Sequence, residues 1–427
     1  MVPLTPQPAL PLPTVDQSGL RLLRSRGRVR GAVALLGPAF VAAVAYVDPG
    51  NFATNFSAGA SFGYSLAWVI IAANLMAMVV QYLSAKAGVA TGRDLPELCR
   101  EHLPKAASYG LWVQAELIAI ATDLAEFVGA AIGLNLLFHI PMFASGLVTA
   151  PVAFGLLALE QRGYRRFELA IAGLLGIVFL GFAYDLVVAG VEPAGVAGGM
   201  VPSLPGNSLL LASGIIGATV MPHVVYLHSA LTKSRVGCRD DSERRELLRF
   251  QRLDVLVALG AAGLVNLSML FIAASLFNHP GGPGVDGIEA AHTGLGQTVG
   301  GVAALAFAVA LLASGLSSSS VGTYAGQVVM QGFINRRIPL FLRRGLTMLP
   351  ALVVLGLGLP TTSSLVVSQV VLSFGIPFAL VPLLLLTRRA DVMGPLVNRR
   401  ITTVVTVCIA SLITALNFYL LYATFLA

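Results

Sequence analysis

Two long runs without any charged side chain constrain what this chain can fold into. Residues 52–85 and residues 401–427 contain no Lys, Arg, Asp or Glu. A helix of about 20 apolar residues crosses the hydrocarbon core of a bilayer, so each run is long enough to span one. Only 11% of the chain is charged, whereas soluble domains average about 25%. Because a segment within lipid must satisfy its own backbone hydrogen bonds, we predict an all-α polytopic membrane protein.

Eleven apolar segments are predicted to be transmembrane helices. Before them, the Pro-rich residues 1–30 are predicted to form a disordered cytoplasmic segment, which leaves 31–427 as a single transmembrane domain. The arginines that precede the first span also resemble the start of a signal peptide, but that charged region is too long, so a first transmembrane helix is favoured. The spans lie near 33–61, 64–88, 107–135, 141–159, 167–190, 208–231, 254–278, 295–331, 342–359, 363–386 and 401–426.

The positions of the basic residues predict the orientation. If the N-terminus is inside and the spans alternate, the cytoplasmic segments hold all 27 Lys and Arg residues and the outer loops hold none. Basic residues concentrate on the cytoplasmic side, so we expect a multi-pass protein of the cell (inner) membrane with its C-terminus outside. The net charge of +7 then reflects topology and contact with anionic membrane lipid, and no nucleic-acid partner is expected. Residues 233–252 are predicted to form a short surface helix.

The first and sixth spans contain a similar interruption. Both have Ala-x-Val, one functional side chain and then Pro. They occupy corresponding places in two five-helix halves, 33–190 and 208–386, and 401–426 remains as an extra helix. Because five is odd, the two halves would cross in opposite directions, an inverted repeat that is common in secondary transporters. The two motifs read Ala45-Tyr46-Val47-Asp48-Pro49-Gly50-Asn51 and Ala218-Thr219-Val220-Met221-Pro222-His223.

Each proline is expected to free one backbone carbonyl inside its span. Proline has no N–H, so Pro49 leaves the carbonyl of Ala45 without its helical partner, and Pro222 does the same for Ala218. Two simple proline kinks would also explain this pattern. A charged Asp48 within a span costs about 2.5–3.5 kcal/mol, which favours a functional site at the breaks.

The side chains at the breaks resemble a ligand set for a transition metal ion. Asp48 and Asn51 are three residues apart and can face one point, and Met221 takes the place of Asp48 in the other half. Oxygen ligands alone suit Mg²⁺ and Ca²⁺, whereas a thioether favours softer ions such as Mn²⁺, Fe²⁺, Co²⁺ or Cd²⁺. Alternatively, Asp48 only caps the following half-helix through Asn51, and Met221 only fills space.

The third span carries several acidic residues that could relay protons. Glu116 and Asp123 are seven residues apart, hence on one helical face, and Glu126 follows Asp123 by three. Acidic residues inside a membrane mark proton or ion routes, although interhelical hydrogen bonding is the simpler alternative. Arg343 and Arg344, at the inner end of the ninth span, are the expected ionic partners.

Two histidines and two outer acids complete the candidates. His223 directly follows the second break, so a gating or proton-linked role is favoured, whereas His228 is interpreted as structural. Asp185 and Glu192 are expected near the outer surface, where they could attract cations.

These motifs resemble those of the Nramp family (natural resistance-associated macrophage proteins). The resemblance rests on Asp48-Pro49-Gly50-Asn51, on Met221-Pro222-His223 and on residues 315–332, and it extends from about residue 31 to the end. It implies a LeuT-type fold with eleven helices and proton-coupled uptake of Mn²⁺ and Fe²⁺.

The same resemblance implies roles for individual residues. Asp48, Asn51, Met221 and the carbonyl of Ala218 would bind the metal, and Ala45 would add its carbonyl in one conformation. Gln369, in the tenth span, would join the site during closure. Asp123, Glu126, Arg343 and Arg344 would form the proton route, which begins at Asp48.

The sequence therefore predicts a proton-coupled secondary transporter that imports divalent transition metal ions by alternating access. It is expected to act as a monomer without a cofactor. A cation-coupled symporter of a small organic solute is the alternative, although Asp48 would repel an anionic carboxylate. A channel would need a ring of like groups, and no H-E-x-x-H or G-x-S-x-G motif indicates an enzyme.

Overall fold

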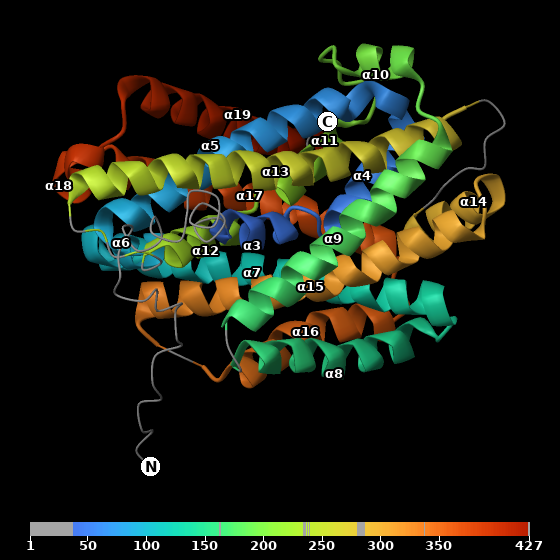
Figure 1. Cartoon of the computed structure of the whole chain (residues 1–427), viewed down its shortest axis with the longest axis horizontal. Coiled ribbons are helices and arrows are strands. Elements are labelled where there is room, and N and C mark those ends of the chain that lie inside the picture. The colour runs from blue at the N-terminus through green and yellow to red at the C-terminus, as the bar shows by residue number, and fades with distance from the viewer. Residues whose placement is uncertain are drawn as a thin grey trace, which may run out of the picture.

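The computed structural model describes residues 37–161, 164–233, 236, 238, 240–279, 287–336 and 338–425. Within these residues the chain forms helices, turns and no strand. Most of the long helices run along the long axis of the molecule (Figure 1). The segment 1–30, predicted to be disordered, lies outside the described residues.

Both predicted interruptions are present. The first span consists of α3 (Pro38–Ala45) and α4 (Pro49–Phe62), and the sixth of α11 (Leu209–Thr219) and α12 (Pro222–Lys233). The second half-helix starts with proline in each case, because the first turn of a helix does not need that residue's N–H. The breaks therefore lie where the sequence places them.

The other predicted spans also coincide with helices. Eight stretches of the described chain are long and apolar enough to cross a membrane, so the protein is a multi-pass membrane protein, while the count of eleven crossings stays a prediction. The helices are α5 (Ala67–Thr91), α7 (Lys105–Phe138), α8 (Met142–Gln161), α9 (Tyr164–Ala189), α13 (Asp241–Phe277), α15 (Gly301–Ile334), α16 (Leu340–Gly356), α17 (Thr361–Thr387) and α19 (Arg400–Phe425).

The surface helix predicted at 233–252 is not a separate element. Instead α13 begins at Asp241 and continues without a break into the predicted seventh span. The Asp240 side chain caps its first turn, and Leu247 and Leu248 are buried in a small apolar cluster. No helix breaker follows these residues, so the charged and apolar parts form one helix.

The segment predicted at 295–331 is divided in two. The short helix α14 (Ile288–Thr298) ends before Gly300, whose φ of 124° is accessible to glycine and strained for other residues. Further short elements were not predicted, because they are too short for a hydropathy signal. They are η1 (Gly63–Leu66), α6 (Leu95–His102), α10 (Pro193–Gly199), α18 (Ala390–Met393) and η2 (Gly394–Leu396).

Helices α7 and α15 pack closely at the centre of the bundle. A Cβ added at Gly315 would lie 2.7 Å from the backbone nitrogen of Ala130, and one at Gly133 would lie 2.8 Å from Leu312. Small residues of this kind let membrane helices approach each other. This contact places the acidic face of α7 against α15 and α16.

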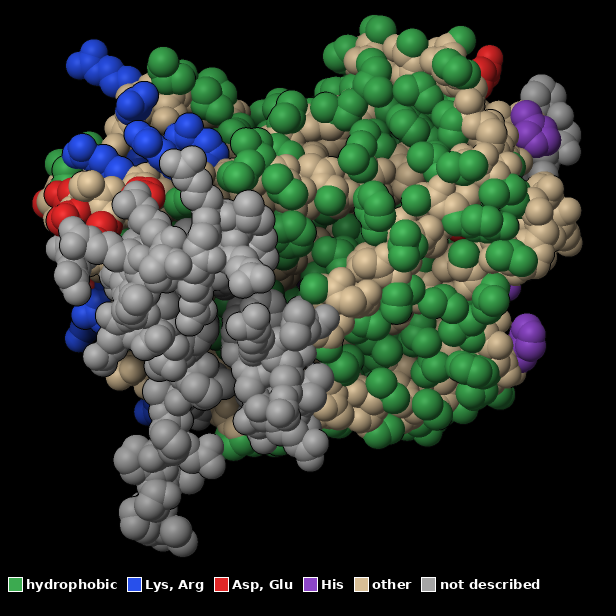
Figure 2. Space-filling view, viewed as in Figure 1, with side chains coloured by type: hydrophobic (Ala, Val, Ile, Leu, Met, Phe, Trp, Pro, Cys, Tyr) green, Lys and Arg blue, Asp and Glu red, His purple; other side chains and the backbone are tan. Residues whose placement is uncertain are grey.

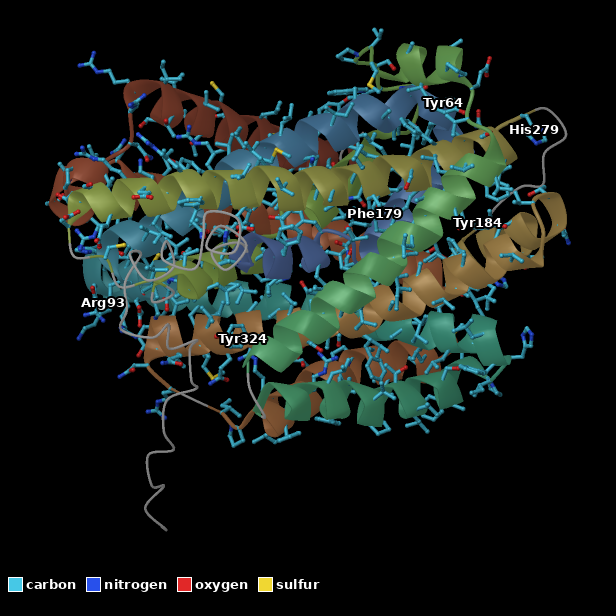
Figure 3. All side chains as sticks on the ribbon, in the orientation of Figure 1. Tyr64, Arg93, Phe179, Tyr184, His279 and Tyr324 are labelled. Carbon is cyan, nitrogen blue, oxygen red and sulfur yellow. The ribbon has the colours of Figure 1, made fainter. Side chains whose placement is uncertain are left out.

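The two ends of the bundle differ in charge. Lys and Arg side chains gather at the end that carries α18 and the start of α13 (Figure 2). Arg93 lies at this end, whereas Tyr64 and His279 lie at the opposite end (Figure 3). Between the ends, large apolar side chains such as Leu180 and Val187 of α9 are 69% and 81% exposed, as expected for a surface that faces lipid.

Candidate metal centre

Asp48 lies between the two halves of the first broken helix and is fully buried. Its Oδ1 accepts a hydrogen bond of 2.8 Å from the backbone N–H of Asn51, which caps α4. Its Oδ2 is 3.5 Å from the side-chain nitrogen of Gln369. The capping interpretation therefore accounts for one oxygen, while the other faces α17.

The side chain of Asn51 is held in one orientation by the backbone and by α13. Its Nδ2 donates to the carbonyl of Tyr46 at 2.9 Å and to Oδ1 of Asn266 at 3.0 Å. Asn266 also donates to the Tyr46 carbonyl. The amide oxygen of Asn51 is buried and accepts no hydrogen bond among the described residues, so it is available to a ligand.

The second break carries Met221, which is fully buried. No described donor bonds the carbonyl of Ala218 or that of Ala45, as expected from the prolines four residues further on. The breaks thus provide two free carbonyls and one thioether, in addition to the carboxylate and the amide.

Gln369 of α17 lies against both breaks. A Cβ added at Gly50 would be 1.8 Å from its Nε2, and one added at Gly217 would be 1.9 Å from its carbonyl oxygen. Gly50 follows Asp48 by two residues, and Gly217 precedes Ala218. Gln369 therefore packs against both breaks, and its side-chain oxygen has no partner in the described structure; its participation in the site stays a prediction.

Clusters of three His, Cys, Asp or Glu side chains that could hold a metal do not occur in the described part of the chain. The predicted site does not require one, because it contains a single carboxylate. Its other donors are an amide oxygen, backbone carbonyls and a thioether, which together suit an ion softer than Ca²⁺.

The predicted acid and arginine partners meet in pairs beside this centre. Arg344 is 3.3 Å from Asp123, and Arg343 is 2.6 Å from Glu116. Arg344 also donates to the hydroxyl of Thr323 at 2.8 Å. Each arginine thus neutralises a different acid of α7.

In the described part of the chain, Glu126 forms no salt bridge with an arginine. It is fully buried, and a Cβ added at Gly322 would be 2.7 Å from its Oε2. Asp123, Arg344 and Asp48 all act on it electrostatically. Glu126 is therefore near both Asp48 and the Asp123–Arg344 pair.

Helix α7 touches both broken helices. A Cβ added at Gly129 would lie 2.0 Å from the Cβ of Pro49. The hydroxyl of Thr122 and Nδ1 of His223 share a hydrogen bond of 3.3 Å, whereas Nε2 of His223 has no described partner. His223 is therefore in contact with the acidic helix, and its proton-linked role stays a prediction.

The remaining candidates lie away from the centre. His228 shares a hydrogen bond of 2.9 Å with Gln81, whose nitrogen donates to the Tyr46 hydroxyl, a contact between helices. Asp185 is buried near the end of α9, at 1% exposure, so it is not a surface residue as expected, whereas Glu192 is exposed.

Four phenylalanines that the sequence motifs do not include pack together further along α4 from Asp48. Phe52 and Phe56 are one and two turns along α4. The ring of Phe52 is 5.0 Å from Phe182, and that of Phe56 is 5.0 Å from Phe307. This cluster separates the centre from the end of the bundle that carries Tyr64.

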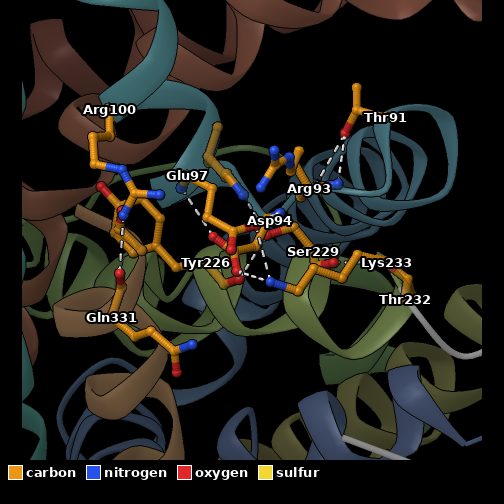
Figure 4. A network of polar contacts seen from close by, with 12 residues as sticks. Thr91, Arg93, Asp94, Glu97, Arg100, Tyr226, Ser229, Thr232, Lys233 and Gln331 are labelled. Atoms are coloured by element: carbon orange, nitrogen blue, oxygen red, sulfur yellow. Dashed lines mark hydrogen bonds and ion pairs between the residues drawn. The ribbon is translucent and has the colours of Figure 1, made fainter. Parts of the chain in front are cut away.

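A polar network closes the opposite end (Figure 4). Nζ of Lys233, at the end of α12, is 2.5 Å from Asp94 and 2.9 Å from Glu97. Both acids belong to the capping box of α6. Arg100 of α6 donates to backbone carbonyls at the end of α15. The short helix α6 therefore connects the second broken helix to α15.

Burial and the charge of Lys233 set the pKa values of the two acids in this network. Burial raises the pKa of Asp94 to about 6, although Lys233 acts in the opposite direction. Burial also acts to raise the pKa of Glu97, but the backbone N–H of Asp94 and Lys233 outweigh it, and the pKa lies below its usual value. Glu97 thus stays ionised where Asp94 begins to bind a proton.

Two interrupted helices that converge on a buried carboxylate, within a bundle of long apolar helices, define a membrane transporter. The family model for natural resistance-associated macrophage protein-like proteins matches residues 39–423. The chain belongs to the Nramp family of transporters and is not an enzyme.

Individual relatives agree with this assignment. The chain is 52% identical over 398 residues to the divalent metal cation transporter MntH of Bacillus subtilis, covering 93% of both chains. It is 54% identical over 395 residues to MntH of Deinococcus radiodurans, covering 92% of this chain and 91% of that protein.

Solved structures show the same architecture. A mutant of the Eremococcus coleocola manganese transporter matches with a TM-score of 0.80 at 32% identity, covering 93% of this chain and 88% of that one. Mhp1, a nucleobase-cation-symport-1 family transporter, matches with a TM-score of 0.61 at 15% identity, over 82% and 77% of the two chains. The latter likeness concerns the fold alone.

Proposed function

We propose that this protein imports divalent transition metal ions, Mn²⁺ first among them, together with protons. The observation that carries the proposal is the buried free oxygen of Asn51 beside the Asp48 carboxylate, at the point where Gln369 approaches both breaks. Relatives named as divalent metal cation and manganese transporters support the choice of substrate.

The proposed ligands are Asp48, Asn51, Met221 and the carbonyls of Ala218 and Ala45, with Gln369 nearby. The carboxylate supplies charge, and the thioether of Met221 disfavours Ca²⁺ and Mg²⁺, which prefer oxygen.

The proposed architecture is a LeuT-type inverted repeat. It comprises the halves 33–190 and 208–386 and the extra helix 401–426, with eleven crossings, the N-terminus inside and the C-terminus outside. The matched breaks and the fold likeness to Mhp1 support it. The basic end would face the cytoplasm of the cell, across the inner membrane.

Alternating access is supported by closures on both sides of the site. Asp48, Asn51 and Met221 are at most 1% exposed. The phenylalanine cluster lies on one side, and the network of Lys233, Asp94 and Glu97 closes the other. A transporter requires two such barriers that open in turn, whereas a channel requires a continuous path.

The proposed proton route starts at Asp48 and passes Glu126 to reach Asp123. The electrostatic coupling of Glu126 to both aspartates supports this order. Arg344 would then stabilise the ionised Asp123 after the proton leaves, and the Glu116–Arg343 pair would continue the route toward the basic end. His223 would respond to the proton through Thr122 of α7.

Uptake into proteoliposomes tests the proposal. Asp48→Ala is expected to abolish Mn²⁺ uptake, because the site loses its only carboxylate, whereas Asp391→Asn, an exposed acid, should leave uptake unchanged. Near-normal Mn²⁺ uptake by Asp48→Ala would reject the metal site.

Proton coupling is tested separately. Asp123→Asn is expected to reduce the acidification that accompanies uptake and to spare metal flux. An equal loss of metal flux and acidification would instead assign Asp123 a structural role.

A further inference from the structure

Lys86 is a buried cation that has no acidic partner among the residues the structure describes. It lies near the end of α5 at 8% exposure, and its Nζ donates to Oδ1 of Asn398 at 2.8 Å. Among the described residues no carboxylate forms a salt bridge with it. An ammonium group can donate three hydrogen bonds, and a buried charge is costly unless it is paired.

Two further cations surround Lys86. Arg399, which precedes α19, acts on it as a like charge. The guanidinium of Arg252 on α13 lies 5.2 Å from the ring centroid of Tyr82, and Tyr82 is one helical turn before Lys86 on α5. The salt bridges of the described chain include neither Arg252 nor Arg399. Three positive charges therefore lie around one face of α5.

Arg389 shows that this end can neutralise an arginine. Arg389 precedes Arg399 in the segment between α17 and α19, and its guanidinium pairs with Asp391 at 2.5 Å. Lys86 differs from Arg389 in its burial, because the Arg389 side chain is 43% exposed, whereas Lys86 is 8% exposed and pairs with no carboxylate of the described chain.

Exposed apolar side chains follow two of these cations along their helices. They come directly after Arg252 on α13 and after Arg399 and Arg400 at the start of α19, and Figure 2 shows hydrophobic side chains beside the basic end. A phosphate with two acyl chains fits such a surface, because the cations bind the headgroup and the helices contact the tails. The exposed residues are Leu253, Leu256, Val257, Ile401, Val404 and Val405.

We propose that Lys86, Arg252 and Arg399 form a binding site for the headgroup of an anionic phospholipid in the leaflet at the basic end. The bound phosphate supplies the missing counter-charge for Lys86. It also links α5 to α13 and to α19, each of which packs against α5. The site is separate from the metal centre, and lipid binding does not depend on transport.

Binding is measured by native mass spectrometry of the purified full chain titrated with phosphatidylglycerol or phosphatidylcholine. The wild type should retain phosphatidylglycerol preferentially. Each cation near a membrane surface contributes about fivefold to anionic lipid binding, so Arg399→Gln and Lys86→Gln should each weaken retention about fivefold. Arg389→Gln is the matched control and should retain the lipid as the wild type does.

Several outcomes would overturn the proposal. One is equal retention of both lipids by the wild type, and another is unchanged phosphatidylglycerol retention in Arg399→Gln and Lys86→Gln. A third is full competition by inorganic phosphate, which would make this a phosphate site without lipid specificity. Arg399 is exposed, so Arg399→Gln keeps the test decisive if Lys86→Gln fails to fold.

Discussion

The carboxylate of Asp254 on α13 caps the first half-helix at the backbone N–H of Ala39. That hydrogen bond is 3.0 Å long, and the N–H of Gly37 lies 3.2 and 3.3 Å from the two carboxylate oxygens. The first N–H groups of a helix lack partners within it. A negative charge there is also stabilised by the positive end of the helix dipole. Helix α13 therefore holds both ends of α3, because Asn266 bonds the Tyr46 carbonyl that follows it.

Asp254→Ala is expected to release the start of α3. Loss of a capping side chain costs about 0.5–2 kcal/mol, and amide hydrogen exchange across residues 38–45 should accelerate accordingly. Asp254→Asn keeps an acceptor oxygen and should exchange at a rate closer to the wild type. Identical exchange in Asp254→Ala and the wild type would show that other contacts hold α3.

Asn266→Ala should weaken Mn²⁺ binding, although Asn266 is not a proposed ligand. Without it, the side-chain nitrogen of Asn51 loses one of the two acceptors that hold its amide oxygen toward the site. Partners of metal ligands typically contribute 10–100-fold to metal affinity, so we expect at least a tenfold rise in Kd by isothermal titration calorimetry. Asn135→Ala, at the far end of α7, should bind Mn²⁺ normally. If both variants bind alike, Asn51 is oriented by other groups.

Substitutions at the two glycines beside Gln369 should differ in severity. In Gly217→Ala the new methyl group meets the Gln369 backbone, so α11 and α17 must separate at a cost of about 1–3 kcal/mol. In Gly50→Ala it meets only the end of the Gln369 side chain, which can rotate away. We expect Gly217→Ala to lower the melting temperature, and Gly50→Ala mainly to weaken metal uptake. The reverse order would show that α17 is not the rigid neighbour of the second break.

The sequence predicts the breaks and brings the proposed ligands Asp48 and Asn51 together, because both features depend on residues that are close in the chain. Pro49 and Pro222 interrupt their helices wherever they occur in the fold, and Asp48 and Asn51 are only three residues apart. The arginine partners of α7 could also be predicted, because few charges are available within the spans.

The supporting residues could not be predicted, because their partners are remote in the sequence. Asn51 and Asn266 are 215 positions apart, and Gly37 and Asp254 are 217 apart. An isolated Asn or Asp in an apolar helix gives no sign of which helix it faces. The capping box at Asp94 and Glu97 was visible in the sequence as D-x-x-E, so α6 could have been found.

Lys233→Met should destabilise the protein in a manner that depends on pH. It leaves Asp94 and Glu97 facing each other, and because Lys233 lowers the pKa of Asp94, its loss moves that pKa above about 6. Asp94 in the folded variant then binds a proton more readily than it does in the unfolded chain. The free energy of unfolding of the variant, compared with that of the wild type, therefore rises as pH falls through this pKa. These side chains are at most 14% exposed, and we expect a loss of about 1–3 kcal/mol at pH 7.5.

Thermal unfolding at several pH values measures this effect. The deficit of Lys233→Met should shrink between pH 7.5 and pH 5.5, as Asp94 becomes neutral, whereas Arg389→Gln, which breaks an exposed pair, should show little change at either pH. A deficit that grows toward pH 5.5 would contradict the assignment of Asp94 as the titrating group.

Met221→Ala should broaden the choice of metal without abolishing Mn²⁺ transport. Alanine leaves Asp48, Asn51 and the free carbonyls in place, and the space opened beside them admits water, which Ca²⁺ and Mg²⁺ accept as a ligand. Cd²⁺, which gains most from sulfur, should lose affinity. Uptake of Mn²⁺ in the presence of increasing Ca²⁺ measures the change, with Met269→Ala as a control for the loss of a buried methionine elsewhere. If Ca²⁺ competes equally in the wild type and in Met221→Ala, the thioether does not select the metal.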